Sequence, residues 1–108
     1  MRALVLPLVA IAIAGCGSSD AKPVAASATT VDIKSFKYKP VTVAVRKGGS
    51  VRWTNSDDAA HTATADDRSF DTQTINKGAA RMVTFTSAGT FAYHCDFHPF
   101  MKATVVVK

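Results

Sequence analysis

From residue 31 onward the chain consists of short segments in which apolar and polar residues alternate, and this pattern constrains the fold more than any other feature. Val, Ile and Thr are frequent in these segments, and Gly, Pro, Asn and Asp separate them. Alternation with a period of two residues is typical of β-strands with one buried face. We therefore expect strands at residues 31–33, 40–45, 50–55, 61–65, 80–85, 90–95 and 102–108.

The spacing of these strands predicts the fold class. No segment has the periodicity of a long amphipathic helix, although residues 66–77 are irregular enough to hold one helical turn. Consecutive short strands without intervening helices predict an all-β domain, a small antiparallel Greek-key β-sandwich or barrel. The last strand is mostly apolar and should lie centrally in a sheet. Trp53 shares a strand face with Val51 and should anchor the core.

The N-terminal segment has a different composition. Arg2 precedes an apolar run at residues 3–14, which is too short to span a membrane and predicts a signal peptide at residues 1–15. The end of this run, residues 13–16, resembles a bacterial lipobox, in which Cys16 receives a lipid and begins the mature chain. Secretion with another cleavage site is the alternative. Residues 16–29 bury little and predict a flexible tether, so the folded domain is expected at residues 30–108.

Export and charge limit the possible partners. The sequence predicts an exported, extracytoplasmic protein that is anchored to a bacterial membrane through Cys16, and we expect a monomer. The net charge is +5, or +4 without Arg2, and the basic residues are scattered except for Lys34, Lys37 and Lys39. Without a basic patch interleaved with aromatic residues, nucleic-acid binding is not expected. The paired acids at 57–58 and 66–67 are interpreted as solvated loop charges.

A loop just before the last strand carries three potential metal ligands. Cys95, His98 and Met101 offer a thiolate, an imidazole and a thioether, which are the soft and borderline donors that copper selects. Lipidation of Cys16 leaves Cys95 as the only free thiol of the mature chain. Two alternatives remain open, since a Cys-x-x-His pair also occurs in zinc sites and a lone Met is often core filler.

A further ligand must come from elsewhere in the chain. His94 adjoins Cys95 and should point to the opposite face of its strand, so we expect a surface or supporting role for it. His61 follows the loop at residues 56–60 and is the better candidate. Two His, one Cys and a weak axial Met would form a blue-copper electron-transfer centre.

The segment at residues 93–101, Tyr-His-Cys-Asp-Phe-His-Pro-Phe-Met, closely resembles the ligand loop of the amicyanin group of cupredoxins. The resemblance extends to residues 51–55, followed by five residues and His61. It implies a cupredoxin fold and one copper ion held by His61, Cys95, His98 and Met101. It also implies that Asn55 bonds the ligand loop next to the Cys, although a turn-forming Asn is the alternative.

The sequence departs from the family pattern near the predicted site. Ala60 stands where amicyanins tend to have Pro, and Asp96-Phe97 replaces the usual Thr-Pro. The ligand loop is therefore expected to be less stiff. Asp96 also adds a negative charge that should favour Cu(II) and lower the potential.

The predicted function is single-electron transfer rather than catalysis, since four protein ligands leave no position for a substrate. By resemblance, electrons pass through His98 to redox proteins that dock transiently on Phe97, Pro99 and Phe100. The competing interpretation is a copper carrier or storage protein that delivers the ion. A structural or adhesion module is a third, in which the ligands would have no role.

Overall fold

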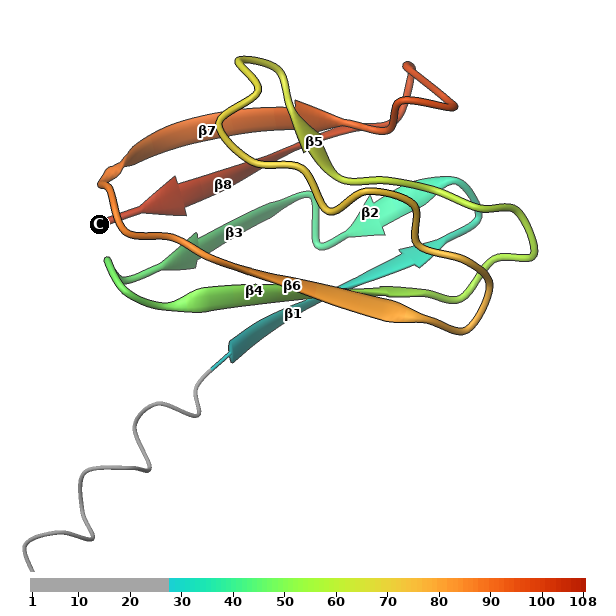
Figure 1. The fold of residues 1–108 in the computed structure, drawn as a ribbon, viewed down its shortest axis with the longest axis horizontal. Helices are drawn as coiled ribbons and strands as arrows, with labels where there is room; N and C mark the ends of the chain where they lie inside the picture. Colours follow the sequence, from blue (N-terminus) through green and yellow to red (C-terminus); the bar gives the residue numbers. More distant parts are fainter. Residues whose placement is uncertain (1–27) are drawn as a thin grey trace, which may run out of the picture.

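The computed structural model describes residues 28–108, which form eight strands in two sheets packed face to face (Figure 1). One sheet has the order β2-β1-β4-β6 and the other the order β3-β8-β7-β5. The strands are β1 (Ala28–Lys34), β2 (Lys37–Lys39), β3 (Thr42–Val45), β4 (Ser50–Asn55), β5 (Thr64–Ala65), β6 (Ala80–Thr84), β7 (Gly89–His94) and β8 (Lys102–Val107). No helix occurs within this range. The prediction of an all-β sandwich is confirmed.

The folded region begins earlier than the sequence indicated. Strand β1 starts at Ala28, and its first two residues pair with the beginning of β4, so Ala28 and Thr29 belong to the sheet and not to the tether. The predicted signal peptide at residues 1–15, Cys16 and the rest of the tether lie outside the described residues. Within residues 28–108, no helix has the length and apolar character needed to cross a membrane.

Two strand pairs differ from the antiparallel arrangement that was expected. Strand β1 runs parallel to β4, and β3 runs parallel to β8, so that both sheets are mixed. The alternation of residues fixes which face of a strand is buried but carries no information on the direction of its neighbour. The expectation for the last strand is confirmed, because β8 lies between β3 and β7.

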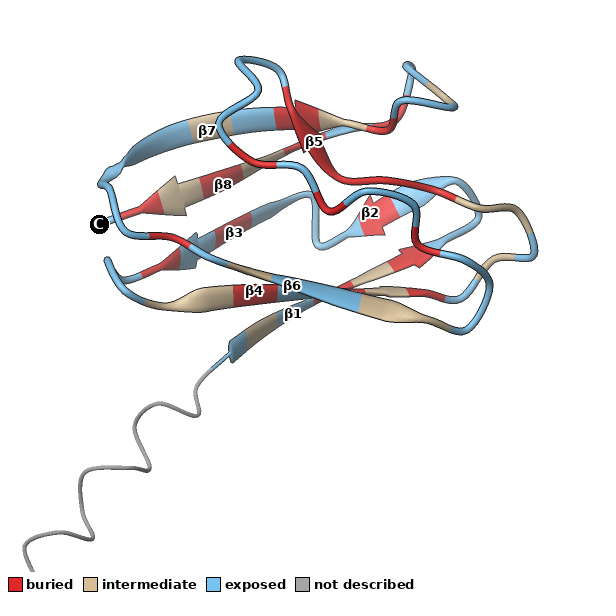
Figure 2. Cartoon of the chain, viewed as in Figure 1, coloured by how far each residue is buried: buried red, intermediate tan, exposed pale blue. Residues whose placement is uncertain are grey.

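The core lies between the two sheets and is built around Trp53. Its ring stacks on Phe70 at a centroid distance of 5.7 Å and meets Tyr93 edge-on at 5.5 Å. The indole Nε1–H donates a hydrogen bond of 3.1 Å to the Tyr93 hydroxyl, so the polar atoms of both buried rings are paired. Figure 2 shows buried and exposed residues alternating along the strands. The predicted core role of Trp53 is confirmed.

The segment between β4 and β6 is mostly irregular. The strand expected at residues 61–65 contracts to β5, and residues 66–77 contain no helical turn. Isolated bridges between His61 and Ile75 and between Thr64 and Asp71 hold the segment together. In the first bridge, the His61 N–H and carbonyl both bond Ile75, at 3.1 and 2.7 Å. Both main-chain polar groups of His61 are therefore held by one residue of the segment that follows.

Three connections meet at one end of the sandwich. They are the β1–β2 turn at residues 35–36, the loop at residues 56–60 and the β7–β8 loop at residues 95–101, all on the right of Figure 1. The C-terminus lies at the opposite end. These connections carry the residues singled out from the sequence.

Candidate metal centre

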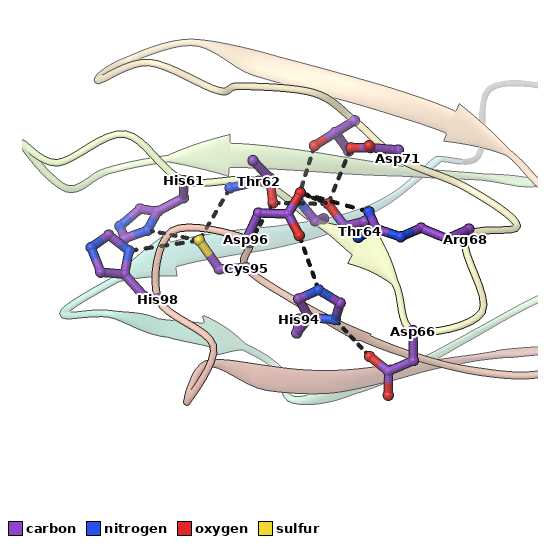
Figure 3. Close-up of polar contacts among 12 residues, drawn as sticks. His61, Thr62, Thr64, Asp66, Arg68, Asp71, His94, Cys95, Asp96 and His98 are labelled. Atoms are coloured by element: carbon purple, nitrogen blue, oxygen red, sulfur yellow. Dashed lines mark hydrogen bonds and ion pairs between the residues drawn. The ribbon is translucent and has the colours of Figure 1, made fainter.

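Three donor atoms converge at this end of the molecule. The Cys95 Sγ lies 3.7 Å from the His61 Nδ1 and 3.6 Å from the His98 Nδ1, and the three ligand atoms all lie within 4.8 Å of one another. Both imidazole rings are directed at the sulfur (Figure 3). Cys95 and His61 are buried, and His98 is half-buried. A thiolate with two imidazoles is the equatorial donor set of blue-copper sites.

The loop that carries Cys95 and His98 is closed by its own main chain. The His98 N–H donates to the Cys95 carbonyl at 3.3 Å, and the Met101 N–H donates to the His98 carbonyl at 2.8 Å. The Cys95 N–H in turn donates to the Met101 carbonyl at 3.2 Å. These bonds join the three predicted ligands of this loop in one tight turn, with Met101 buried at its end.

The orientation of the His61 ring is fixed by Asp57. The Asp57 Oδ2 lies 2.9 Å from the His61 Nε2, which donates its proton and leaves the Nδ1 lone pair directed toward Cys95. The same carboxylate accepts the N–H groups of Ser35 at 2.7 Å and Phe36 at 2.9 Å. Desolvation raises the pKa of Asp57, but the amides of Phe36 and Ser35 and the His61 ring outweigh it and hold this pKa below its usual value.

The β1–β2 turn needs this carboxylate. Ser35 and Phe36 have φ angles of 55° and 57°, a left-handed conformation that non-glycine residues rarely adopt. Two consecutive residues with positive φ form the tight hairpin that suits the twist of the strands. Asp57 was interpreted as a solvated charge, and this is wrong because its side chain is only 11% exposed and bonds both turn amides.

The expected bond between Asn55 and the ligand loop is absent. The Asn55 Nδ2 instead donates to the carbonyls of Ala59 at 2.8 Å and Ile75 at 2.9 Å, and its Oδ1 accepts the Asp57 N–H at 2.8 Å. Asn55 is fully buried and supports the loop before His61. The turn role that was the alternative for Asn55 is present, because its Oδ1 accepts the N–H two residues on, while its Nδ2 also bonds the remote carbonyl of Ile75.

Thr62 makes the bond that was assigned to Asn55. Its Oγ1 accepts the Asp96 N–H at 2.9 Å, and its own N–H donates to the Cys95 Sγ at 3.4 Å. The second contact places a hydrogen-bond donor on the sulfur, and the first fixes the main chain that follows Cys95. Sequence reasoning missed Thr62, although its position directly after His61 was an available signal.

Asp96 anchors the ligand loop from its outer side. Its carboxylate lies 3.0 Å from the His94 Nε2, 3.3 Å from the Thr64 hydroxyl and 3.9 Å from Arg68 (Figure 3). The His94 Nδ1 bonds Asp66 at 2.7 Å, so His94 lies between two carboxylates. His94 therefore has the supporting role expected of it, whereas Asp66 is not a free loop charge. The Asp96 side chain therefore supplies a constraint on the ligand loop that was not expected from the sequence.

An apolar surface surrounds the exposed edge of His98. Phe97 and Phe100 are 51% and 69% exposed, and Pro99 between them is also exposed. Phe36, which the sequence did not point to, completes this surface. Its ring meets His61 at 5.2 Å, His98 at 4.9 Å and Phe100 at 6.4 Å.

Comparison with known proteins agrees with this geometry. The cupredoxin-like domain family matches residues 5–107. The chain is 36% identical to amicyanin of Paracoccus denitrificans over 93 residues, which cover 82% of this chain and 71% of the relative. It is 32% identical to amicyanin of Paracoccus versutus over 97 residues, with 81% and 74% covered.

Comparison with solved structures also finds similarity to amicyanins. A reduced Cu(I) form of an amicyanin variant is 36% identical, with a TM-score of 0.69 and 76% of this chain and 83% of that chain covered. An oxidised amicyanin variant is 35% identical, with a TM-score of 0.70 and coverage of 75% and 82%. The chain belongs to the cupredoxin family, in which its relatives are amicyanins.

Proposed function

We propose that the protein is a blue-copper electron carrier in which His61, Cys95, His98 and Met101 hold one copper ion. The observation that carries the proposal is the convergence of the Cys95 thiol with two Nδ1 atoms, at 3.6 and 3.7 Å, in a member of the cupredoxin family. Met101, buried at the end of the same loop, is proposed as the weak axial ligand. Copper in such a site supplies a reversible one-electron couple.

The protein's own contacts suit this task. Little has to move during electron transfer if the ligand geometry is held independently of the charge on the metal. The main-chain bonds within residues 95–101 hold Cys95 and His98, and Asp57 holds His61. The Thr62 N–H stabilises the thiolate. With four protein ligands no position is left for a substrate, so we propose a carrier and not an enzyme.

The route for the electron is proposed to run through His98. This ring is half-buried and connects the site to the apolar surface formed by Phe97, Pro99, Phe100 and Phe36. Redox proteins would dock there transiently, because a small contact area allows rapid release after each transfer. A copper carrier or storage protein is not favoured, since the buried thiolate and His61 offer no open path for handing on the ion.

Export and anchoring are also proposed. The signal-like run at residues 1–15, the lipobox-like residues 13–16 and the polar residues that follow support an extracytoplasmic domain tethered to a bacterial membrane through Cys16. We propose that the domain is a monomer.

The proposed site is tested by adding Cu(II) to the purified apoprotein. An intense blue charge-transfer absorption from thiolate to copper should appear, and ascorbate should bleach it reversibly. Cys95→Ser should remain colourless, because the thiolate is the source of the band. A colourless wild-type product would refute the blue-copper centre.

A further inference from the structure

The apolar surface at the metal end has basic residues on one side only. Lys37 and Lys102 line a hollow of about 180 Å³ together with Phe36, Val41 and Phe100. The hollow lies between the start of β8 and strand β2, directly beside the ligand loop. Lys34 and Lys39, next to it on β1 and β2, are exposed as well. We call Lys34, Lys37, Lys39 and Lys102 the lysine flank.

No carboxylate neutralises these lysines within an ion-pair distance. Among residues 28–108, none of the ion pairs includes a member of the lysine flank. Lys34 and Lys37 are even direct cross-strand partners in the β1–β2 hairpin. Like charges in directly opposed positions destabilise a strand pair, so the fold gains nothing from this arrangement.

The carboxylates closest to the proposed ligands are held by other groups. Asp57 bonds His61 and the hairpin amides, Asp66 and Asp96 enclose His94, and Asp58 pairs with Lys77 at 3.1 Å. Asp32 faces Lys39 across the hairpin, but Lys34, Lys37 and Lys102 have no such neighbour among these carboxylates, so the charge beside the hollow is mainly positive. A partner surface with carboxylates on the matching side would be attracted and oriented by it.

Edge protection is a competing explanation for part of this pattern. Strand β2 is at the edge of its sheet, and lysines on edge strands prevent association with other strands. This explains Lys37 and Lys39, but not Lys102, which lies at the start of the central strand β8.

We propose that the lysine flank orients the electron-transfer partner, and that this partner is a redox protein with an apolar docking centre bordered on one side by carboxylates. The inference rests on the proposed electron-carrier function and adds the chemistry of the partner. Apolar contact at Phe36, Val41 and Phe100 supplies attraction at close range. The lysines act earlier, during encounter, and select the orientation in which His98 faces the partner's redox group.

The first test locates anion binding without using electron transfer. Hexacyanochromate(III), a paramagnetic trianion, is added to the ¹⁵N-labelled metal-free protein, and broadening of the amide signals is measured. Broadening should be strongest at Lys37 and Lys102 and weak at Lys47 and Lys108, which adjoin each other at the opposite end of the domain. Broadening that is equal at both ends would overturn the proposal and leave the copper site unaffected.

The second test measures oxidation of the reduced copper protein by hexacyanoferrate(III). One electron leaves the protein and reduces Fe(III) to Fe(II). Lys37→Glu with Lys102→Glu should slow this reaction about tenfold at low salt, and the effect should shrink as salt screens it. Oxidation by the cationic tris(phenanthroline)cobalt(III) should instead become faster.

A matched control variant separates the effect of local charge on the rates from the effect of net charge. Lys47→Glu with Lys108→Glu changes the net charge by the same amount at the distant end and should alter either rate less than about twofold. Equal effects of the two double variants would contradict a docking role for the lysine flank. An apoprotein that never becomes blue would refute the proposed function instead.

Discussion

Asp57 joins two segments that lie far apart in the sequence. Its carboxylate bonds the amides of Ser35 and Phe36, 22 and 21 residues away, and also the His61 ring. One side chain therefore stabilises an unfavourable hairpin turn and sets the tautomer of a proposed ligand. At the scale of single residues, this coupling links the stability of the fold to the geometry of the metal site.

Asp57→Asn should destabilise the apoprotein by about 1–3 kcal/mol, because the charged acceptor of three hydrogen bonds is lost. The pKa of Asp57 is below its usual value near 3.8, so the folded state favours the ionised form. Its contribution is complete above about pH 4 and is lost as the pH falls through the folded-state pKa. Urea unfolding at pH 7 and at pH 3 measures this. A difference between wild type and variant that is as large at pH 3 as at pH 7 would contradict the assignment.

Met101→Leu isolates the axial role of the thioether. Leu fills a similar volume, so the fold should lose less than about 1.5 kcal/mol, and the blue colour should remain. The reduction potential should rise, because Cu(II) loses more than Cu(I) when an additional donor is removed. Voltammetry of the copper-loaded variant checks this. An unchanged potential would make Met101 a core residue and not a ligand.

At the scale of elements, the β7–β8 loop depends on neighbours that the sequence does not reveal. Asp96 and Phe97 replace the stiff Thr-Pro of the resembled family, which led to an expectation of a looser loop. The carboxylate of Asp96 is instead fastened by His94 and Thr64, and His94 by Asp66. A side-chain network thus holds the ligand loop in place.

Asp66→Asn should weaken this hydrogen-bond network without changing the packing of the hydrophobic core. The amide group keeps its size but is a weaker hydrogen-bond acceptor for His94 than a carboxylate is. We expect the amides of residues 95–101 to exchange hydrogen at least about fivefold faster, while the exchange of β8 core amides is unchanged. Asp67→Asn is the matched control, because Asp67 bonds only the neighbouring Ser69. Equal effects of the two variants would show that the network does not hold the loop.

The strands and turns also show which parts of the fold could be predicted from the sequence alone. Alternation predicted most strands, the central place of β8 and the core role of Trp53, since burial of one strand face is a local property of the residues. Strand direction, Asp57 and Thr62 were missed because each depends on a partner that is remote in the sequence. The β1–β2 turn was hidden as well, since Ser35-Phe36 has none of the Asn-Gly or Gly-rich character of such turns.

At the scale of the whole molecule, the position of the site could be predicted from the sequence. Three donor residues in two loops, together with the resemblance to one family, indicated it. Cys95, His98 and His61 were predicted from donor chemistry and spacing, and the fold brings them together. The family pattern also pointed to these three residues, but it assigned to Asn55 a bond that Thr62 makes. Ligand types are fixed by the metal's chemistry, whereas the hydrogen bonds around them change with each substitution nearby.

The proposed lipid anchor can be tested on the full-length protein. Cells expressing the chain should incorporate labelled palmitate into it, because a lipobox Cys receives acyl chains after export. Cys16→Ala should abolish the label and release the protein from the membrane fraction. Cys95→Ala serves as the control that keeps the label. Incorporation that survives Cys16→Ala would refute lipidation at this residue.

The direction of strand β1 determines where the proposed site lies relative to the start of the domain. The described chain enters the domain at Ala28, and β1 runs the length of the sheet before its far end reaches the turn that touches His61. Seven residues of extended chain separate the point of attachment from the turn by roughly 20 Å. If the domain is tethered through the residues before Ala28, as we propose, His98 lies at the end of the sandwich away from the point of attachment, where a partner can reach it.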